Sequence, residues 1–288
     1  MDYNTILFDV ADGVGTITLN RRDKLNSFTI RMMDEMLDVI DRIDADDDVR
    51  SVIVTGAGRA FCAGADLSEG AKSFAIDGDA DTLDYATDAA RDGGGRVTLR
   101  LFGCLKPLIA AINGPAVGVG ATMTLPMDVR IASETARIGF VFARRGIVPE
   151  AASSWFLPRV VGISQALEWC YGGGVFDAAE ALSGGLVRSV HAPDELLPAA
   201  RALARKFADG TAPVSVALIR QMMWRGLGMS HPMEAHRVDS RGIVSRGRSA
   251  DVAEGVTSFL AKRPAVFPDQ VSRDMPDFFP WWKEPVYG

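Results

Sequence analysis

The sequence predicts an α/β fold followed by a helical C-terminal region. Up to about residue 194, segments with the two-residue period of strands alternate with segments of helical spacing, and beyond it only helical spacing occurs. In addition, glycine-rich loops follow several of the predicted strands. The 288 residues, 48% of them apolar, are enough for one large domain with a sizeable core.

The first predicted elements are a hairpin, a helix and a strand. Hydrophobic residues alternate on both sides of Asp12–Gly13, a dipeptide that suits a tight turn. Over residues 29–44, apolar side chains recur at helical spacing, which predicts an amphipathic helix. The segment VRSVIVTGAG, residues 49–58, then predicts an apolar strand that ends in a glycine loop.

The middle of the chain predicts an insertion and further strands. Residues 68–95 are rich in Asp, Ala and Gly, which indicates an insertion over the surface or over a site, with its helix content left open. Residues 107–127 carry no charge over a length that could cross a bilayer. Asn113, glycines and prolines interrupt them, so we expect a strand, a loop and a helix start. DVRIAS and ARIGF predict two more strands.

The last third of the chain is predicted to be helical, over residues 195–210, 214–228 and 251–263. The tail beyond them is rich in proline and aromatic residues, and we expect it to run extended with its rings docked on a surface. The predicted organisation is a core with the site at 1–195, a helical region at 196–263 and the tail at 264–288.

Composition excludes several classes of function. Thirty-one Lys and Arg against 37 Asp and Glu give a net charge of −6 without a long basic run, which argues against a nucleic-acid partner. The N-terminal residues MDYNTILFDVADG have neither a basic region nor a continuous apolar one, so we expect a cytoplasmic protein. Three widely separated cysteines and three histidines without ligand spacing predict neither a disulfide framework nor a metal site.

Three segments together predict a ligand site: RRDKLNSF at 21–28, GAGRAFCAGADL at 56–67 and NGPAVGVGATM at 113–123. Each follows a predicted strand, and their small residues let a ligand approach backbone amides closely. Singly, each is also explained by tight packing of a strand against a helix. The glycine motifs of the dinucleotide fold and of the P-loop do not occur in their required context.

The set of motifs resembles the enoyl-CoA hydratase/isomerase family, also called the crotonase superfamily. The matching segments, in the family's order, are NRRDKLNSF, VIVTGAGRAFCAGADL, AINGPAVGVGATM, DVRIAS and EGVTSFLAKR. The resemblance implies a crotonase-like spiral of ββα units with a helical C-terminal oligomerisation region. It also implies an acyl-CoA substrate, no cofactor apart from the coenzyme A of that substrate, and a homotrimer or dimer of trimers without a membrane partner.

The resemblance further implies an oxyanion site made of backbone N–H groups. Members of the family hold the thioester oxygen between two such donors, which by position are those of Ala65 and Val119. The family usually has glycine at the second position. Valine can donate its N–H there only if its φ is negative or strain is tolerated.

The proton-transferring side chain is inferred from the same resemblance. The family's hydratases use two glutamates, and the corresponding positions hold Thr122 and Phe142, neither of which is a carboxylate. Glu150 stands where the family's Δ3-Δ2-enoyl-CoA isomerases carry a catalytic acid. We expect Glu150 at a helix N-terminus, with its pKa raised by apolar surroundings. The alternative is a first-turn glutamate that complements the helix dipole.

Coenzyme A binding is also carried over by position. In the first half of the chain the matching residues are Lys24, Leu25, Ala63, Asp66 and Leu67. Phe259 and Lys262 match positions of the last helix that reach the adenine and phosphates, often from a neighbouring subunit. For Lys262 a solvated helix lysine is the alternative.

The leading prediction is an enzyme that shifts the double bond of an enoyl-CoA through an enolate, with Glu150 as proton shuttle. The first alternative is an enoyl-CoA hydratase of the fatty-acid β-oxidation type. The second is a non-catalytic acyl-CoA-binding scaffold, because both hydratase glutamates are missing.

Overall fold

A six-stranded sheet forms the centre of the computed structural model, which describes residues 3–70, 73 and 84–287. The strands lie in the order β1-β2-β3-β4-β6-β9, with β1 and β2 antiparallel and all later neighbours parallel. Their bounds are Ile6–Ala11 (β1), Val14–Leu19 (β2), Ser51–Gly56 (β3), Leu108–Ile112 (β4), Val129–Ser133 (β6) and Ser189–His191 (β9). The predicted hairpin is confirmed, and Asp12 and Gly13 at its turn both have positive φ.

A second sheet consists of three short strands in the order β5-β7-β8. Their bounds are Ala116–Val117 (β5), Arg137–Gly139 (β7) and Val175–Asp177 (β8). The chain visits the two sheets in turn: β4 leads into β5 and then helix α3 (Val119–Thr122), and β6 leads into β7 and later α4 (Ser153–Val161). This repetition is the expected pattern of ββα units.

The uncharged segment 107–127 is therefore a buried strand, a short second strand and a helix start, as predicted. In the part of the chain that the structure describes, no helix is both long enough and apolar enough to span a bilayer.

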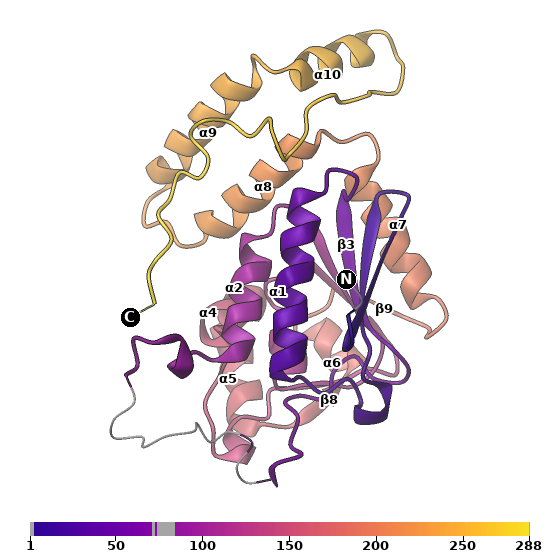
Figure 1. Cartoon of the computed structure of the whole chain (residues 1–288), viewed down its shortest axis with the longest axis vertical. Helices are drawn as coiled ribbons and strands as arrows, with labels where there is room; N and C mark the ends of the chain where they lie inside the picture. Colours follow the sequence, from indigo (N-terminus) through magenta and orange to yellow (C-terminus); the bar gives the residue numbers. More distant parts are fainter. Residues whose placement is uncertain (1–2, 71–72, 74–83, 288) are drawn as a thin grey trace.

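Helices cover both faces of the large sheet (Figure 1). On one face α1 (Ile30–Ala45) packs against α2 (Gly93–Gly103), and on the other lies α7 (Leu196–Ala208). Alternate residues of a strand face opposite ways, so in β3 Val52 and Val54 join the first core and Ile53 joins the second. The predicted boundary after residue 195 thus separates α7 from the sheet on which it packs.

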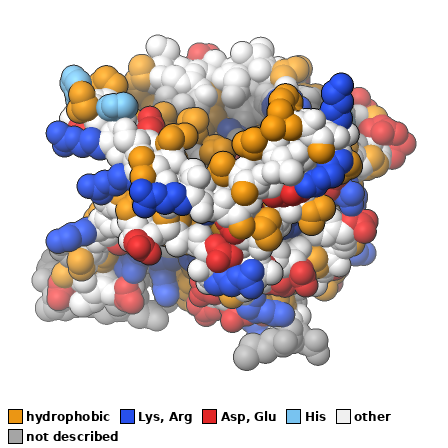
Figure 2. All heavy atoms as spheres, turned by 90° about the horizontal axis from the view of Figure 1, so that it is seen from above, with side chains coloured by type: hydrophobic (Ala, Val, Ile, Leu, Met, Phe, Trp, Pro, Cys, Tyr) orange, Lys and Arg blue, Asp and Glu red, His pale blue; other side chains and the backbone are white. Residues whose placement is uncertain are grey.

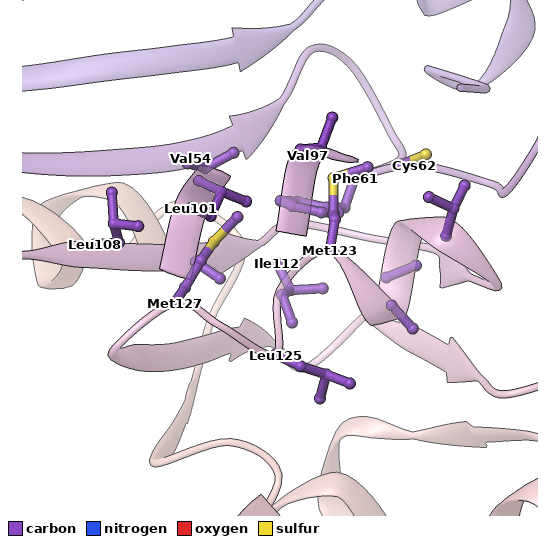
Figure 3. Packing of buried hydrophobic residues seen from close by; sticks show 14 of the residues in the cluster. Val54, Phe61, Cys62, Val97, Leu101, Leu108, Ile112, Met123, Leu125 and Met127 are labelled. Carbon is purple, nitrogen blue, oxygen red and sulfur yellow. The ribbon is translucent and has the colours of Figure 1, made fainter. Parts of the chain in front are cut away.

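The larger core holds α2 against the segment that follows α3. Figure 3 shows Val97 and Leu101 of α2 near Met123 and Met127, which follow α3. All four side chains are fully buried. Burial of one such side chain contributes roughly 1.5–3 kcal/mol relative to exposure, so the relative placement of these two helices is strongly determined.

The other helices of the described residues are α5 (Ile163–Gly172), α6 (Ala178–Ser183), α8 (Pro213–Gly226), α9 (Pro232–Arg246), α10 (Ala250–Leu260) and the 3-10 turns Arg22–Lys24, Asp88–Ala90 and Ala143–Arg145. Arg220 fastens α8 to the body of the protein. Its buried guanidinium pairs with Asp128 at 2.9 Å and donates to carbonyl oxygens at the end of α2, including those of Leu101 and Phe102.

The tail turns back from α10 toward the start of α2 (Figure 1). The Trp282 ring stacks on the Arg225 guanidinium, 3.3 Å from the ring centroid, and the Tyr287 ring lies 5.1 Å from the guanidinium of Arg91. The structure assigns no helix or strand to residues 264–287. The predicted docking of the rings is confirmed, whereas turns at 271–273 and 277–278 interrupt the expected extended course of the tail.

Helices α2, α5, α6 and α9 are not predicted by the sequence, and for α2 and α9 the physical reason is clear. α2 begins inside the segment assigned to the 68–95 insertion, because three consecutive glycines lower helix propensity and hide its periodicity. Asp92 compensates by capping the helix. α9 buries only Val238 and Gly242, so it lacks a clear apolar stripe. Residues 71–72 and 74–83 of the insertion lie outside the described residues.

Candidate active site

A cavity of about 1050 Å³ opens where the loops that follow β3 and β5 meet the starts of α1 and α2. It is lined by all of residues 63–69, 90–94 and 117–119, by parts of 28–33 and 141–154, and by Ser73. Two of the three segments predicted to form a site, 56–67 and 113–123, contribute to it most directly. The third, 21–28, contributes Phe28.

The backbone N–H groups of Ala65 and Val119, which both line this cavity, have no acceptor among the described residues. Beside Ala65, Phe28 N–H donates to the Gly64 carbonyl and Asp66 N–H donates to the Phe28 carbonyl. Val119 begins α3, where the first N–H groups lack intrahelical partners. Both amides are therefore available to an anionic or strongly polarised oxygen of a ligand.

The positive φ that the second loop requires falls on Gly118, at 54°, and not on Val119. Valine therefore occupies its position without left-handed strain. Gly64 has a φ of 108°, and a Cβ added there would lie 3.1 Å from the Val117 carbonyl oxygen. Glycine is required at this position for both reasons.

Glu150 lines the same cavity and is partly buried. Thr122 Oγ1, fully buried in α3, donates a hydrogen bond of 2.6 Å to Glu150 Oε1. The pKa of Glu150 is raised from 4.5 to about 7: burial is the main cause and the negative charge of Asp92 adds to it, against the lowering effect of the Thr122 hydroxyl. A carboxyl group with this pKa exchanges protons readily near neutral pH.

The other carboxylates that line the cavity either form an ion pair, cap a helix or are exposed. Asp66 pairs with Arg21 at 2.8 Å, and hydrogen bonds with Ser68 and Arg21 hold its pKa well below the usual range. Asp92 caps α2, and Glu69 is exposed. Glu150 Oε2, in contrast, accepts no hydrogen bond from the described residues, so this oxygen is open to a ligand.

Comparison with known proteins agrees with this geometry. The sequence profile of the family described as enoyl-CoA hydratase/isomerase matches residues 9–270. The chain belongs to the enoyl-CoA hydratase/isomerase family.

Individual relatives cover nearly the whole chain. An enoyl-CoA hydratase of Alternaria alternata is 42% identical over 260 residues, which are 90% of this chain and 84% of the relative. A 1,2-epoxyphenylacetyl-CoA isomerase of Escherichia coli (strain K12) is 35% identical, over 91% of this chain and 97% of the relative. A solved structure of an enoyl-CoA hydratase from Bacillus anthracis superposes with a TM-score of 0.83 at 30% identity, covering 92% of this chain and 99% of that one. The chain is thus an enzyme of the crotonase superfamily, with its fold.

The structure brings only some of the expected coenzyme A residues to the cavity. Ala63, Asp66 and Leu67 line it. Lys24 lines a separate hollow of about 410 Å³ formed by residues 20–24, and the Leu25 carbonyl accepts a hydrogen bond from Ala63 N–H at 3.0 Å. The 21–28 segment therefore abuts the wall of the cavity.

Phe259 and Lys262 are not brought to the cavity of their own chain. Phe259 lies near the end of α10 with 80% of its surface exposed, and Lys262 is exposed just beyond this helix.

The prediction that Glu150 stands at a helix N-terminus is wrong. Helix α4 begins at Ser153, and Ala151 and Ala152 between them have positive φ values of 57° and 52°. The Glu150 carbonyl oxygen accepts hydrogen bonds from Ser153 N–H and Oγ–H, which makes a turn before the helix. The raised pKa is in the expected direction, and its main cause is burial.

Three residues around Glu150 are not predicted as site residues by the sequence: Thr122, Asp92 and Gly94. Thr122 lies one turn after Val119 in the same helix, a spacing that could have indicated a shared site. A Cβ added to Gly94 would overlap Glu150 Oε2 and approach Val119 Cγ2 to 3.1 Å. Glycine at this position leaves room for the carboxylate.

Proposed function

We propose that this enzyme isomerises an unsaturated acyl-CoA, moving a double bond from the 3 position to the 2 position of the acyl chain. The observation that carries the proposal is one partly buried carboxyl group, Glu150, with a pKa near 7 in the cavity that contains two unpaired backbone N–H groups. One base is sufficient for this reaction, because the proton that it removes is returned to the same molecule.

In the proposed mechanism the Glu150 carboxylate removes a proton from C2 of a 3-enoyl thioester. The electron pair delocalises over the thioester oxygen and the C3–C4 double bond, which forms a dienolate. The N–H groups of Ala65 and Val119 stabilise the negative oxygen, a contribution of about 2.7–4 kcal/mol for one donor in comparable sites. The protonated Glu150 then delivers its proton to C4, which restores the carboxylate and conjugates the double bond with the thioester.

The proposed substrate contacts use the family's positions. Ala63, Asp66 and Leu67 are proposed to contact the coenzyme A portion at the cavity, with Lys24 and Leu25 beside them. The chemistry uses no cofactor other than this portion of the substrate.

Phe259 and Lys262 are proposed to reach a neighbouring subunit's coenzyme A in a homotrimer or dimer of trimers. Exposed apolar side chains on α9 and α10 support such self-association: Ile243 is 77% exposed, Phe259 80% and Leu260 74%. Figure 2 looks at the end of the molecule formed by α8, α9 and α10, where hydrophobic side chains lie among charged ones.

Hydration of an enoyl-CoA is the second candidate. Several relatives are named enoyl-CoA hydratases, among them one with 42% identity. Phe142, 2% exposed, lines the cavity at the position where the family's hydratases carry a second glutamate. A hydratase mechanism would therefore have to activate water with Glu150 alone.

Ultraviolet absorbance distinguishes these reactions. A 3-enoyl-CoA and, separately, crotonyl-CoA are mixed with wild-type protein, Glu150→Gln and the control Glu69→Gln, which changes an exposed glutamate of the same cavity. Isomerisation increases the conjugation absorbance of the 3-enoyl substrate, and we expect Glu150→Gln to lose at least about a hundredfold in rate while Glu69→Gln retains it.

Loss of conjugation from crotonyl-CoA, without reaction of the 3-enoyl substrate, would show that the enzyme is a hydratase and that the isomerase proposal is wrong. Binding of both thioesters without turnover would instead indicate an acyl-CoA-binding scaffold.

A further inference from the structure

The loop that carries Glu150 is attached to α2 through both polar groups of the next residue, Ala151. Ala151 N–H donates to Asp92 Oδ2 at 2.6 Å. Thr98 Oγ1 donates to the Ala151 carbonyl oxygen at 2.9 Å. Asp92 caps α2 and Thr98 lies within it, so two side chains of one helix hold one residue of a distant loop.

This attachment holds an unfavourable backbone conformation. Ala151 and Ala152 are consecutive non-glycine residues with φ values of 57° and 52°, and Ala151 is fully buried. Left-handed conformations of this kind persist only where the surrounding structure imposes them. If the two hydrogen bonds were lost, Ala151 would be free to relax, and the adjacent Glu150 would move with it.

Both carboxylate oxygens of Asp92 accept hydrogen bonds from backbone amides. Oδ1 accepts from Gly94 N–H at 2.9 Å, and Oδ2 accepts from Gly95 N–H at 2.9 Å as well as from Ala151 N–H. Three amide donors therefore hold this carboxylate at the helix N-terminus. Its contacts point to an effect that acts through Glu150.

We propose that Asp92 and Thr98 are positioning residues that hold the Glu150 carboxylate at the reacting carbon atoms through the Ala151 peptide. This inference rests on the proposed function of Glu150. A displacement of about 1 Å at a reacting group can cost a hundredfold in rate, so such an attachment determines activity without touching the substrate.

Several ionisable groups surround Glu150 and can contribute to the pH dependence of kcat/KM. The Thr122 hydroxyl of α3 donates a hydrogen bond to Glu150, and the charge of Asp92, which caps α2, raises its pKa. Cys62, whose pKa burial raises to about 12, is neutral at the pH of assay. The other charged residues that line the cavity are Arg31, Asp66, Glu69, Arg91 and Arg145. Removal of the Asp92 charge lowers the pKa of Glu150 because that charge raises it.

Two substitutions of Asp92 separate its hydrogen bond from its charge. In Asp92→Asn the amide oxygen can still accept from Ala151 N–H, and the charge is gone. In Asp92→Ser the hydroxyl still caps α2, which preserves the helix, but it is too short to reach Ala151. Thr98→Val, of nearly equal volume, removes the hydrogen bond to the Ala151 carbonyl together with a longer one, of 3.2 Å, to the Gly95 carbonyl within α2. Asp88→Asn, an exposed residue paired with Arg91, is the control.

The expected results differ among the variants in steady-state assays with a 3-enoyl-CoA. Asp92→Ser loses about tenfold or more in kcat, with KM within about twofold, and shifts the midpoint of the pH profile of kcat/KM to lower pH. Asp92→Asn shows the shift with kcat within about threefold. Thr98→Val shows the loss in kcat without the shift, and Asp88→Asn behaves as wild type.

Hydrogen exchange of the Ala151 amide provides a readout that is independent of activity. Mass spectrometry of the peptide that contains residues 150–153 is expected to show faster exchange in Asp92→Ser and Thr98→Val than in wild type, while the core strands keep their protection. Unchanged exchange in both variants, or wild-type kcat in both, would overturn the inference.

The catalytic role of Glu150 and the positioning role of Asp92 and Thr98 are tested by different outcomes. If Glu150→Gln retains activity, the proposed function is wrong, and the exchange measurement still decides whether Asp92 and Thr98 hold the loop. If Glu150→Gln is inactive but Asp92→Ser and Thr98→Val are fully active, Glu150 keeps its role and the positioning role is rejected.

Discussion

Replacement of Glu150 by Gln is expected to stabilise the protein at alkaline pH while it removes the proposed activity. Burial raises the pKa of Glu150 from 4.5 to about 7, so the folded state binds this proton more tightly than the unfolded state. Each pH unit between the two pKa values is worth about 1.4 kcal/mol. Above pH 7 the ionised carboxylate therefore costs about 3 kcal/mol of the free energy of unfolding.

The direction of the pH dependence follows from proton counts. Below pH 4.5 both states are protonated, and the cost is absent. Between pH 4.5 and 7 the folded state holds a proton that the unfolded state has lost, so the stability of the wild type falls as the pH rises through this window. The side-chain amide of the Glu150→Gln variant is neutral throughout, and the difference between the two proteins isolates this one group.

Urea unfolding at pH 5 and pH 8, at one fixed protein concentration, measures the effect. The stability advantage of Glu150→Gln over wild type is expected to be larger at pH 8 than at pH 5 by about 2.5 kcal/mol. The exposed Glu69→Gln serves as the control. A difference between wild type and Glu150→Gln that is the same at both pH values would refute a raised pKa for Glu150, and with it the physical basis of the proposed base.

The remaining predictions concern the neighbours of Glu150. Thr122→Val removes the hydrogen bond that lowers the pKa of Glu150, so the midpoint of the pH profile of kcat/KM should move to higher pH. Thr122→Ser retains a hydroxyl and should keep the wild-type midpoint. Equal midpoints in wild type and both variants would show that this hydrogen bond does not affect the pKa of Glu150. Gly94→Ala places a Cβ against Glu150 Oε2 and should lose about tenfold or more in kcat and about 1–3 kcal/mol of stability. Gly103→Ala, in the same helix with nothing within 4 Å, should retain both, and wild-type activity in Gly94→Ala would contradict the packing argument.

The elements that the sequence predicts well have strong local periodicity. The hairpin, α1, β3, β4 and the helices α7, α8 and α10 all carry their own pattern of apolar residues, which is a property of a few neighbouring positions. α2 and α9 do not, because glycines obscure the first and polar residues surround the second. Their helical state depends on capping and on packing against other parts of the chain.

Within the candidate site, too, some features are predicted by local sequence and others depend on contacts between distant segments. The loops of Ala65 and Val119 and the position of Glu150 are indicated by motifs, since short segments with characteristic spacing identify the family. The backbone conformation next to Glu150 is not indicated by these motifs. Pro149 suggests that a helix starts there, whereas two residues with positive φ follow Glu150 and α4 begins only at Ser153. Hydrogen bonds from Asp92 and Thr98 hold Ala151 in that left-handed conformation, and the residues next to Ala151 in the sequence do not indicate these bonds.

By itself, the sequence determined the fold class, the strands and helices with strong periodicity, the family and the segments from which a site is made. Only the tertiary structure decided which side chains touch Glu150, since Thr122 lies 28 residues earlier in the chain and Asp92 contacts the loop from 59 residues before Ala151. It also decided that the pKa of Glu150 is near 7, because desolvation depends on everything that packs around a group. The sequence specifies that residue 150 carries a carboxyl group, but the folded surroundings set the proton affinity of that group.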